Sequence, residues 1–224
     1  TLLYAFQIYC DFSGYTCMAR GIAKLCGIEL MENFQRPYLA LSVREFWRRW
    51  HISLSTWLRD YIYISLGGNR KGRLRRYVNI MLTFLISGIW HGTGFHFLLW
   101  GCMHGAIQIL ETPWKRAPKA IRWLLTFGFV DLSWMVFRVN SLGDLKGMLW
   151  IAVTDFRLRD PAGMELGGLE WLLLLIGILL VAGKDILNEK GIGIQGWLQK
   201  RSWLMRALAY TALLSGIVIF GVYG

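Results

Sequence analysis

A histidine inside a glycine-rich break is the feature of this chain most able to do chemistry. The stretch Ser87–Gly94 reads SGIWHGTG and lies within an apolar segment, Tyr77–Leu110, that has no Lys, Arg, Asp or Glu. An ionisable group at membrane depth lowers stability, so it indicates a functional site. A neutral His91 imidazole could remove the proton of a hydroxyl that attacks an ester or thioester. The N–H groups of the nearby glycines would stabilise the developing oxyanion, and Trp90 would wall the pocket.

A second histidine, His51, belongs to a basic stretch rich in tryptophan. Ser42 and Glu45 have the spacing of a capping box, which predicts that a helix begins there. We expect this helix to run through Arg44–Asp60 and to lie at a membrane interface. His51 falls at the edge of its apolar face and is turned inward. That face carries Phe46, Trp47, Trp50, Leu54, Trp57 and Leu58.

The composition is that of an integral membrane protein. Of 224 residues, 55% are hydrophobic and 17% are charged, whereas soluble domains carry roughly a quarter charged residues. Several apolar runs approach the ~20 residues of a membrane-spanning helix, which predicts an all-α, polytopic fold. The ends of the sequence suggest part of a longer protein. The four cysteines lack paired spacing, so we expect buried thiols with neither disulfides nor a metal site.

The formal charge of +11 is concentrated in two blocks, Arg70–Arg76 and Lys115–Arg122. Each block directly adjoins an apolar segment. Positive residues in such places mark cytoplasmic loops and favour anionic lipid headgroups. This pattern argues for membrane lipids as partners and against nucleic acid.

Between these blocks, Tyr77–Leu110 is too long for one ordinary span and too short for two full ones. We predict two short re-entrant helices with their tip near His91–Gly94, and a single tilted helix is the alternative. Non-helical backbone at depth must be buried in protein or line a cavity. The spacings Gly88-x3-Gly92 and Gly101-x3-Gly105 would let helices approach closely.

The rest of the chain reads as further helices, and no soluble second domain is apparent. Residues 1–26 form an apolar run that contains Asp11, which either lines a polar path or fixes packing. Further predicted apolar helices are 122–136, 171–183 and 203–224, with connectors at 29–40, 138–168 and 184–201. Residues 1–224 are therefore treated as one membrane-embedded domain.

Several motifs together resemble those of the membrane-bound O-acyltransferases, and most closely the branch of the alginate O-acetyltransferases. They fall in order across about residues 5–110, and residues 111–224 would add transmembrane and surface helices. A complete member would be about twice as long, so the chain resembles a C-terminal half. The motifs are Asp11-Phe12-Ser13-Gly14-Tyr15, Glu32-Asn33-Phe34 with Pro37-Tyr38, Glu45 to Trp57 (EFWRRWHISLSTW), Arg59-Asp60-Tyr61, Leu66-Gly67-Gly68-Asn69-Arg70 and Ser87-Gly88-Ile89-Trp90-His91-Gly92.

The resemblance implies that His91 is catalytic and that His51 is a second essential histidine. Both would lie in a central tunnel that is reached by an acyl donor from the cytoplasm. Substrate contacts are expected from Arg48, Arg49, Trp90 and Asp11. Relatives often have Ser-Asp after the Asp-Phe-Ser-Gly-Tyr motif, whereas this chain has Thr16-Cys17, so a role for a second carboxylate is in doubt.

The resemblance also implies a bacterial inner-membrane enzyme with several spans and no bound cofactor. Its donor would be acetyl-CoA or a carrier-protein thioester. Its acceptor would be an extracytoplasmic polysaccharide, reached with a periplasmic acetyltransferase as partner. The residues alone leave two alternatives: a transporter or channel that uses the buried His and Asp residues, and a non-catalytic docking subunit.

Overall fold

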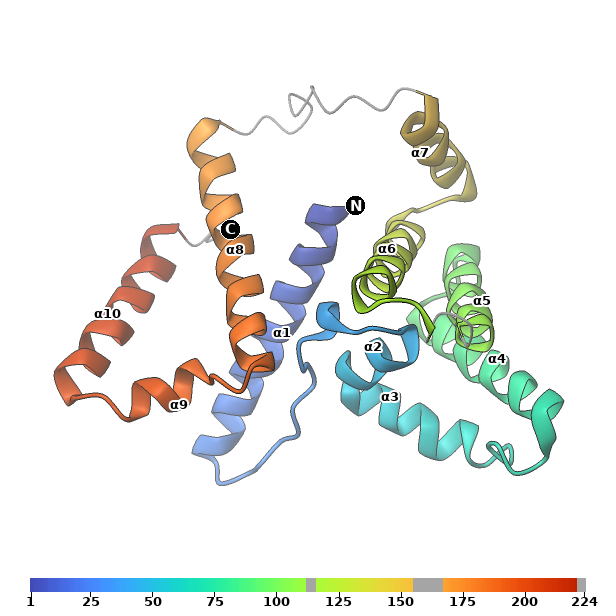
Figure 1. The fold of residues 1–224 in the computed structure, drawn as a ribbon, viewed down its shortest axis with the longest axis horizontal. Coiled ribbons are helices and arrows are strands. Elements are labelled where there is room, and N and C mark those ends of the chain that lie inside the picture. Colours follow the sequence, from blue (N-terminus) through green and yellow to red (C-terminus); the bar gives the residue numbers. More distant parts are fainter. Residues whose placement is uncertain (112–115, 155–166, 221–224) are drawn as a thin grey trace. The chain divides into compact units, whose positions relative to one another are not determined.

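The computed structural model describes residues 1–111, 116–154 and 167–220, and this part of the chain is helical without a β-strand (Figure 1). The predicted all-α class is confirmed. The chain divides into two compact units, Thr1–Gly167 and Gly168–Gly224. Three predicted features lie outside the described residues: Lys115 of the second basic block, residues 155–166 of a connector, and the last four residues.

The first unit contains seven α-helices and two shorter helical turns. Their bounds are α1 Leu2–Leu25, η1 Pro37–Leu39, α2 Val43–Arg49, α3 Ile52–Leu58, η2 Arg59–Tyr63, α4 Gly72–His91, α5 Phe95–Leu110, α6 Lys119–Arg138 and α7 Leu142–Thr154. The second unit contains α8 Gly168–Glu189, α9 Ile194–Gln199 and α10 Trp203–Phe220.

Helix α6 alone in the described part is long and apolar enough to cross a membrane by itself. Two shorter apolar helices, Phe95–Leu110 and Trp203–Ile219, accompany it. Helix α1 runs without interruption through the Asp11 motif and buries only Ala5 and Tyr9. For this reason the prediction of buried thiols is wrong for three cysteines, Cys10, Cys17 and Cys26, which are exposed.

The predicted capping box is present at the start of α2. The Ser42 hydroxyl accepts the Glu45 N–H at 3.1 Å, and the Glu45 carboxylate accepts the N–H of Leu41 at 2.9 Å. A second carboxylate, that of Glu111, accepts the N–H of Val43 at 2.8 Å. Glu111 comes from the end of α5 and is 2% exposed, so it fixes the start of α2 against that helix.

The prediction of one helix through Arg44–Asp60 is wrong, because the helix breaks at His51. His51 adopts a left-handed conformation with φ 45° and ψ 54°, which is uncommon for a residue other than glycine. The connector residue Asn33 holds the break in place: its carbonyl accepts the N–H of Ile52 at 3.1 Å, and its side-chain oxygen accepts that of Ser53 at 2.9 Å. Beyond the break, Leu58 of the predicted apolar face is buried, whereas Trp57 is exposed.

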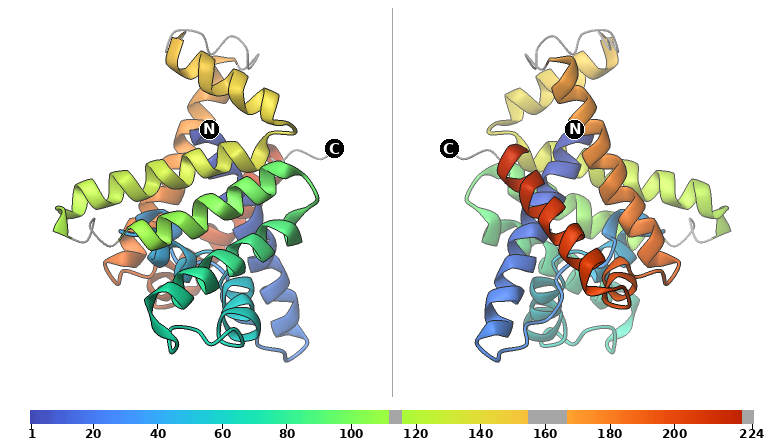
Figure 2. Two further views of the ribbon diagram at one scale, coloured as in Figure 1. Left: turned by 90° about the vertical axis from the view of Figure 1, so that its right-hand side faces the viewer. Right: turned by 90° about the vertical axis from the view of Figure 1, so that its left-hand side faces the viewer.

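Helices α4 and α5 are separated by the predicted break, which excludes the single-helix alternative, and their re-entrant course in a membrane stays a prediction. Figure 2 shows α4, α5 and α6 packed side by side within the first unit. The break occupies Gly92–Gly94. Gly92 has φ 157°, and a Cβ placed there would meet the Phe97 ring at 2.5 Å. Glycine is therefore favoured both by the backbone conformation and by the lack of space for a side chain.

The two predicted glycine spacings bring α4 and α5 into close contact. A Cβ at Gly88 would collide with the carbonyl oxygen of Phe97, and one at Gly101 would collide with that of Phe84. Backbone atoms cannot move aside as a flexible side chain can. The glycines are therefore what lets the backbones of these two helices meet.

We expect Gly101→Val to separate α4 from α5 and to lower the Tm of the detergent-solubilised protein by roughly 2–12 °C, since overpacking against backbone costs roughly 1–3 kcal/mol. Thermal unfolding followed by tryptophan fluorescence measures this. Gly128→Val on α6 is the control, because a Cβ placed at that glycine has nothing within 4 Å. Equal Tm values for the two variants would contradict the close-contact argument.

Candidate active site

His91 ends α4 and is surrounded by aromatic rings from α5 and α6. Its imidazole centroid lies 5.2 Å from that of Trp100 and 5.0 Å from that of Phe137, in both cases edge to face. Phe97 lies further off, at 6.2 Å. The histidine is half-buried, whereas Trp100 is 1% exposed. The glycine break that follows turns the chain back and brings the α5 rings against His91.

His51 also has Trp90 as an aromatic neighbour. The Trp90 ring centroid is 4.9 Å from that of His91 and 6.5 Å from that of His51. His51 also packs edge to face on Phe12 of α1 at 4.7 Å, and its Nδ1 is 3.4 Å from the Ser53 hydroxyl. The left-handed turn at His51 is what directs its ring toward α4. The structure thus brings the two predicted histidines to a single tryptophan.

A third histidine, His104, is part of the core. It is 1% exposed. The Trp47 indole N–H donates to its Nδ1 at 3.1 Å, and its Nε2 lies 3.1 Å from the Ser133 hydroxyl. Because Ser133 donates its own proton to the Val130 carbonyl at 2.7 Å, Nε2 carries the ring proton and donates to Ser133. His104 is therefore a neutral, fully bonded link between α2, α5 and α6.

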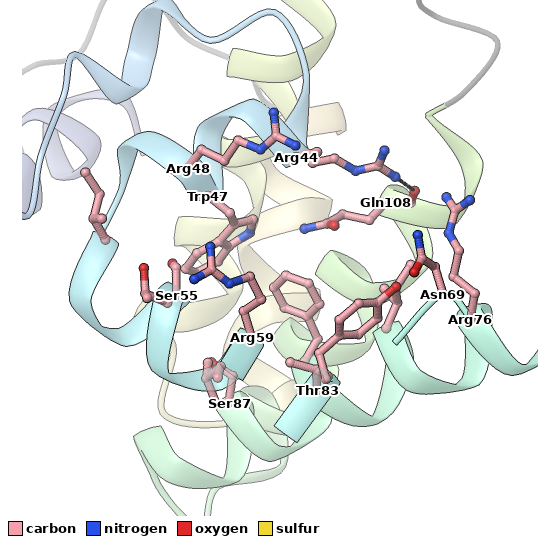
Figure 3. A pocket seen from close by; sticks show the side chains of 16 residues that line it. Arg44, Trp47, Arg48, Ser55, Arg59, Asn69, Arg76, Thr83, Ser87 and Gln108 are labelled. Carbon is pink, nitrogen blue, oxygen red and sulfur yellow. Dashed lines mark hydrogen bonds between the residues drawn. The ribbon is translucent and has the colours of Figure 1, made fainter. Parts of the chain in front are cut away.

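A cavity of about 600 Å³ opens between the α2–α3–η2 segment and the α4–α5 pair (Figure 3). Four arginines line it, Arg44, Arg48, Arg59 and Arg76, and no Asp or Glu is among the lining residues. The others are Trp47, Ile52, Ser55, Thr56, Leu58, Tyr63, Asn69, Ile80, Thr83, Phe84, Ser87 and Gln108. We call this the arginine-lined cavity. Such a lining suits an anionic ligand.

Two of these arginines have carboxylate neighbours outside the lining. Arg59 donates to the Asp60 carboxylate at 2.7 Å, and this hydrogen bond holds the pKa of that carboxyl below its usual value. The Arg44 Nε lies 3.9 Å from the buried Glu111 carboxylate. Sequence reasoning named Arg48 alone among the four. The i, i+4 spacing of Arg44 and Arg48 could have indicated that both lie on one helix face. Nothing in the sequence links Arg76 to them.

The remaining predicted site residues lie outside the arginine-lined cavity. Arg49 does not line the cavity; its guanidinium donates to Glu45 at 2.6 Å. Trp90 is 62% exposed. Asp11 is exposed on α1, one residue before the Phe12 ring that packs on His51. Within the described ranges no three His, Cys, Asp or Glu side chains gather as a metal site would require.

Comparison with known proteins assigns this sequence to a family. The model of the membrane-bound O-acyltransferase family matches residues 1–141. The chain is 43% identical over 190 residues to the "Probable alginate O-acetylase AlgI" of Pseudomonas putida, covering 81% of this chain and 39% of that protein. It is 46% identical over 161 residues to the "Peptidoglycan O-acetyltransferase" of Helicobacter pylori, covering 66% of the chain and 31% of the relative.

A more distant relative is the "Teichoic acid D-alanyltransferase" of Bacillus subtilis, 28% identical over 153 residues, which cover 60% of this chain and 39% of that protein. The chain thus spans less than two fifths of the length of these curated relatives. The predicted resemblance is confirmed, including the alginate O-acetylase branch. This chain belongs to the membrane-bound O-acyltransferase family, and it is part of a membrane protein.

Proposed function

We propose that the protein containing this chain is an O-acyltransferase that moves an acetyl group from a cytoplasmic thioester to hydroxyls of an extracytoplasmic polysaccharide, directly or through a relay protein. The observation that carries the proposal is the meeting of His91 and His51 at Trp90 beside the arginine-lined cavity. The names of the relatives support the reaction class, since two are O-acetyltransferases and one transfers D-alanine to teichoic acid.

In this reaction His91 acts as the general base. Its imidazole accepts the proton of the acceptor hydroxyl as that oxygen attacks the thioester carbon. The aromatic rings around His91 exclude water and favour a neutral imidazole, which is the form that can accept a proton. His51, which contacts the same tryptophan, orients the donor. Asp11 and Arg49 are secondary candidates for substrate contact.

The donor would enter through the arginine-lined cavity. Acetyl-CoA and a carrier-held thioester both carry phosphate, and arginine binds phosphate with charge-assisted hydrogen bonds. Neither donor stays bound after transfer, so no resident cofactor is needed. Arg48 and Arg76 are the two lining arginines for which the structure gives no carboxylate partner among the described ion pairs.

The membrane setting fits a polytopic protein of the bacterial inner membrane. Large apolar side chains are exposed along α8 and α10, among them Leu179, Leu180, Leu213 and Val218. Lipid or the remainder of the protein would cover them. The two histidines would lie in a central tunnel between the cytoplasmic donor and a periplasmic acceptor, where a second acetyltransferase could take over the acyl group.

Deleting the gene and restoring it on a plasmid tests the proposal. The measurement is ester-linked acetate released by mild alkali from the envelope and secreted polysaccharide. We expect deletion to remove this acetate and the full-length protein to restore it. If acetylation survives deletion while uptake of a solute is lost, the protein is a transporter and the proposal is wrong.

We expect Arg48→Gln to raise the apparent KM for acetyl-CoA about 10-fold or more in membrane vesicles, because a hydrogen bond to a charged group contributes about 1.5–3 kcal/mol. The rate at saturation should change little, since the contact lies away from the reacting carbonyl. Arg20→Gln removes an arginine that forms an exposed pair with Glu32 on the connector, and it is the control. An unchanged KM for Arg48→Gln would show that Arg48 does not bind the donor.

A further inference from the structure

Ser87 on α4 carries a buried hydroxyl without a partner. The residue is 1% exposed, and its Oγ has no hydrogen-bond partner within the described part of the chain. A hydroxyl inside a helix ordinarily donates to the carbonyl four residues earlier. Thr83, one turn before, does so and donates to the Asn79 carbonyl at 2.7 Å. A buried polar group that lacks a partner calls for an explanation, such as a catalytic role or a bound water or ion.

Ser87 is one of the residues that line the arginine-lined cavity. The cavity-lining residues of α4 follow one face of the helix, from Arg76 through Thr83 to Ser87 (Figure 3). At 1.5 Å per residue, the face extends about 16 Å between the Arg76 and Ser87 positions. The next residue on that face is His91. The cavity therefore leads from a cationic end to a hydroxyl that lies one helical turn from the proposed base.

We propose that the Ser87 hydroxyl donates a hydrogen bond to the thioester carbonyl of a long donor that lies along α4, with its phosphate at the arginines and its acyl group toward His91. This inference rests on the proposed function and adds to it the placement of the donor and an oxyanion donor. Trp100 also has a buried indole N–H without a partner among the described residues. It does not line the cavity, so Ser87 is the group that a donor in the cavity would meet.

The acceptor oxygen forms a bond to the thioester carbon while its proton passes to His91, and the carbonyl electron pair moves onto oxygen, where the Ser87 O–H stabilises the negative charge. The oxyanion then re-forms the carbonyl and expels the thiolate. The thiolate takes the proton from His91, which leaves an ester, a free thiol and a neutral imidazole.

Ser87→Ala in the full-length protein tests the inference. We expect the rate of O-acetylation to fall about 100-fold, as when one oxyanion donor is removed from other enzymes. The measurement is ester-linked acetate formed per unit of membrane-inserted protein in the complemented deletion strain, so it does not require the donor to be known. The Tm should stay the same or rise, because the substitution removes an unpartnered hydroxyl.

Thr126→Val is the matched control. Thr126 on α6 is 2% exposed, and its hydroxyl, like that of Ser87, has no partner among the described residues. It lies outside the cavity, so its loss should leave the rate unchanged. A normal rate for Ser87→Ala beside an inactive His91→Ala overturns the inference and leaves the proposed function standing. A fall in Tm that accounts for the lost rate also overturns it. If His91→Ala is fully active, both the inference and the proposed function are wrong.

Discussion

His91→Ala is expected to reduce O-acetylation by about 10²–10⁴-fold at a normal level of the protein in the membrane, which is the contribution of a positioned general base. The imidazole is held edge to face against Trp100 and Phe137, and no other described imidazole occupies that position. Alanine leaves the backbone at the end of α4 unchanged but provides no group that accepts a proton. Alkali-released acetate per unit of membrane protein measures the effect.

His96→Gln is the control for this substitution. His96 is half-buried on α5, next to Phe97, with ring centroids 4.1 Å apart. It makes no described contact with His91 or His51, so its variant should retain O-acetylation close to the unmodified level. If His91→Ala is as active as His96→Gln, then His91 is not the general base, and the proposed roles of His91 and His51 are wrong.

His104→Ala is expected to destabilise the protein by about 3 kcal/mol or more. The change leaves the Trp47 indole N–H and the Ser133 hydroxyl without their ring partner, and each buried unsatisfied group costs about 1–3 kcal/mol. It also opens a void between α2, α5 and α6, which adds a cavity cost. Thermal unfolding of the solubilised protein should show a markedly lower Tm and a smaller amount of protein in the membrane.

Temperature separates the two histidine substitutions. Activity per folded His104→Ala molecule should recover when cells are grown in the cold, since His104 holds helices together and contacts no reacting group. His91→Ala should stay inactive at every temperature. An inactive His104→Ala protein with an unchanged Tm would show instead that His104 takes part in the reaction.

The family, the helical class and the break between two helices at His91 can all be predicted from the amino-acid sequence. These follow from local patterns: a charge-free segment between two basic blocks, glycines at four-residue spacing, and the Trp-His-Gly and Trp-Arg-Arg-Trp-His motifs. The capping box at Ser42 and Glu45 was readable for the same reason, since its hydrogen bonds join residues three positions apart. Local hydrogen bonds and steric requirements are encoded in local sequence.

The differences between His51, His91 and His104 arise from contacts between distant parts of the chain. Periodicity predicted an unbroken helix through His51, but Asn33, eighteen residues upstream, takes over the backbone N–H of Ile52 and forces the left-handed turn. His104 lies in the same charge-free segment as His91, and its two hydrogen bonds to residues 57 and 29 positions away make it structural.

The arginine-lined cavity was hidden from the sequence for the same physical reason. It forms where the α2–α3 segment meets the α4–α5 pair, and the packing of the helices, which depends on contacts between distant residues, brings Arg76 to the same space as Arg48. A hydroxyl such as that of Ser87 can be recognised as unpartnered only once every neighbour is in place. The local sequence around His91 predicts its role as a base, and the packing of distant segments determines which groups surround it.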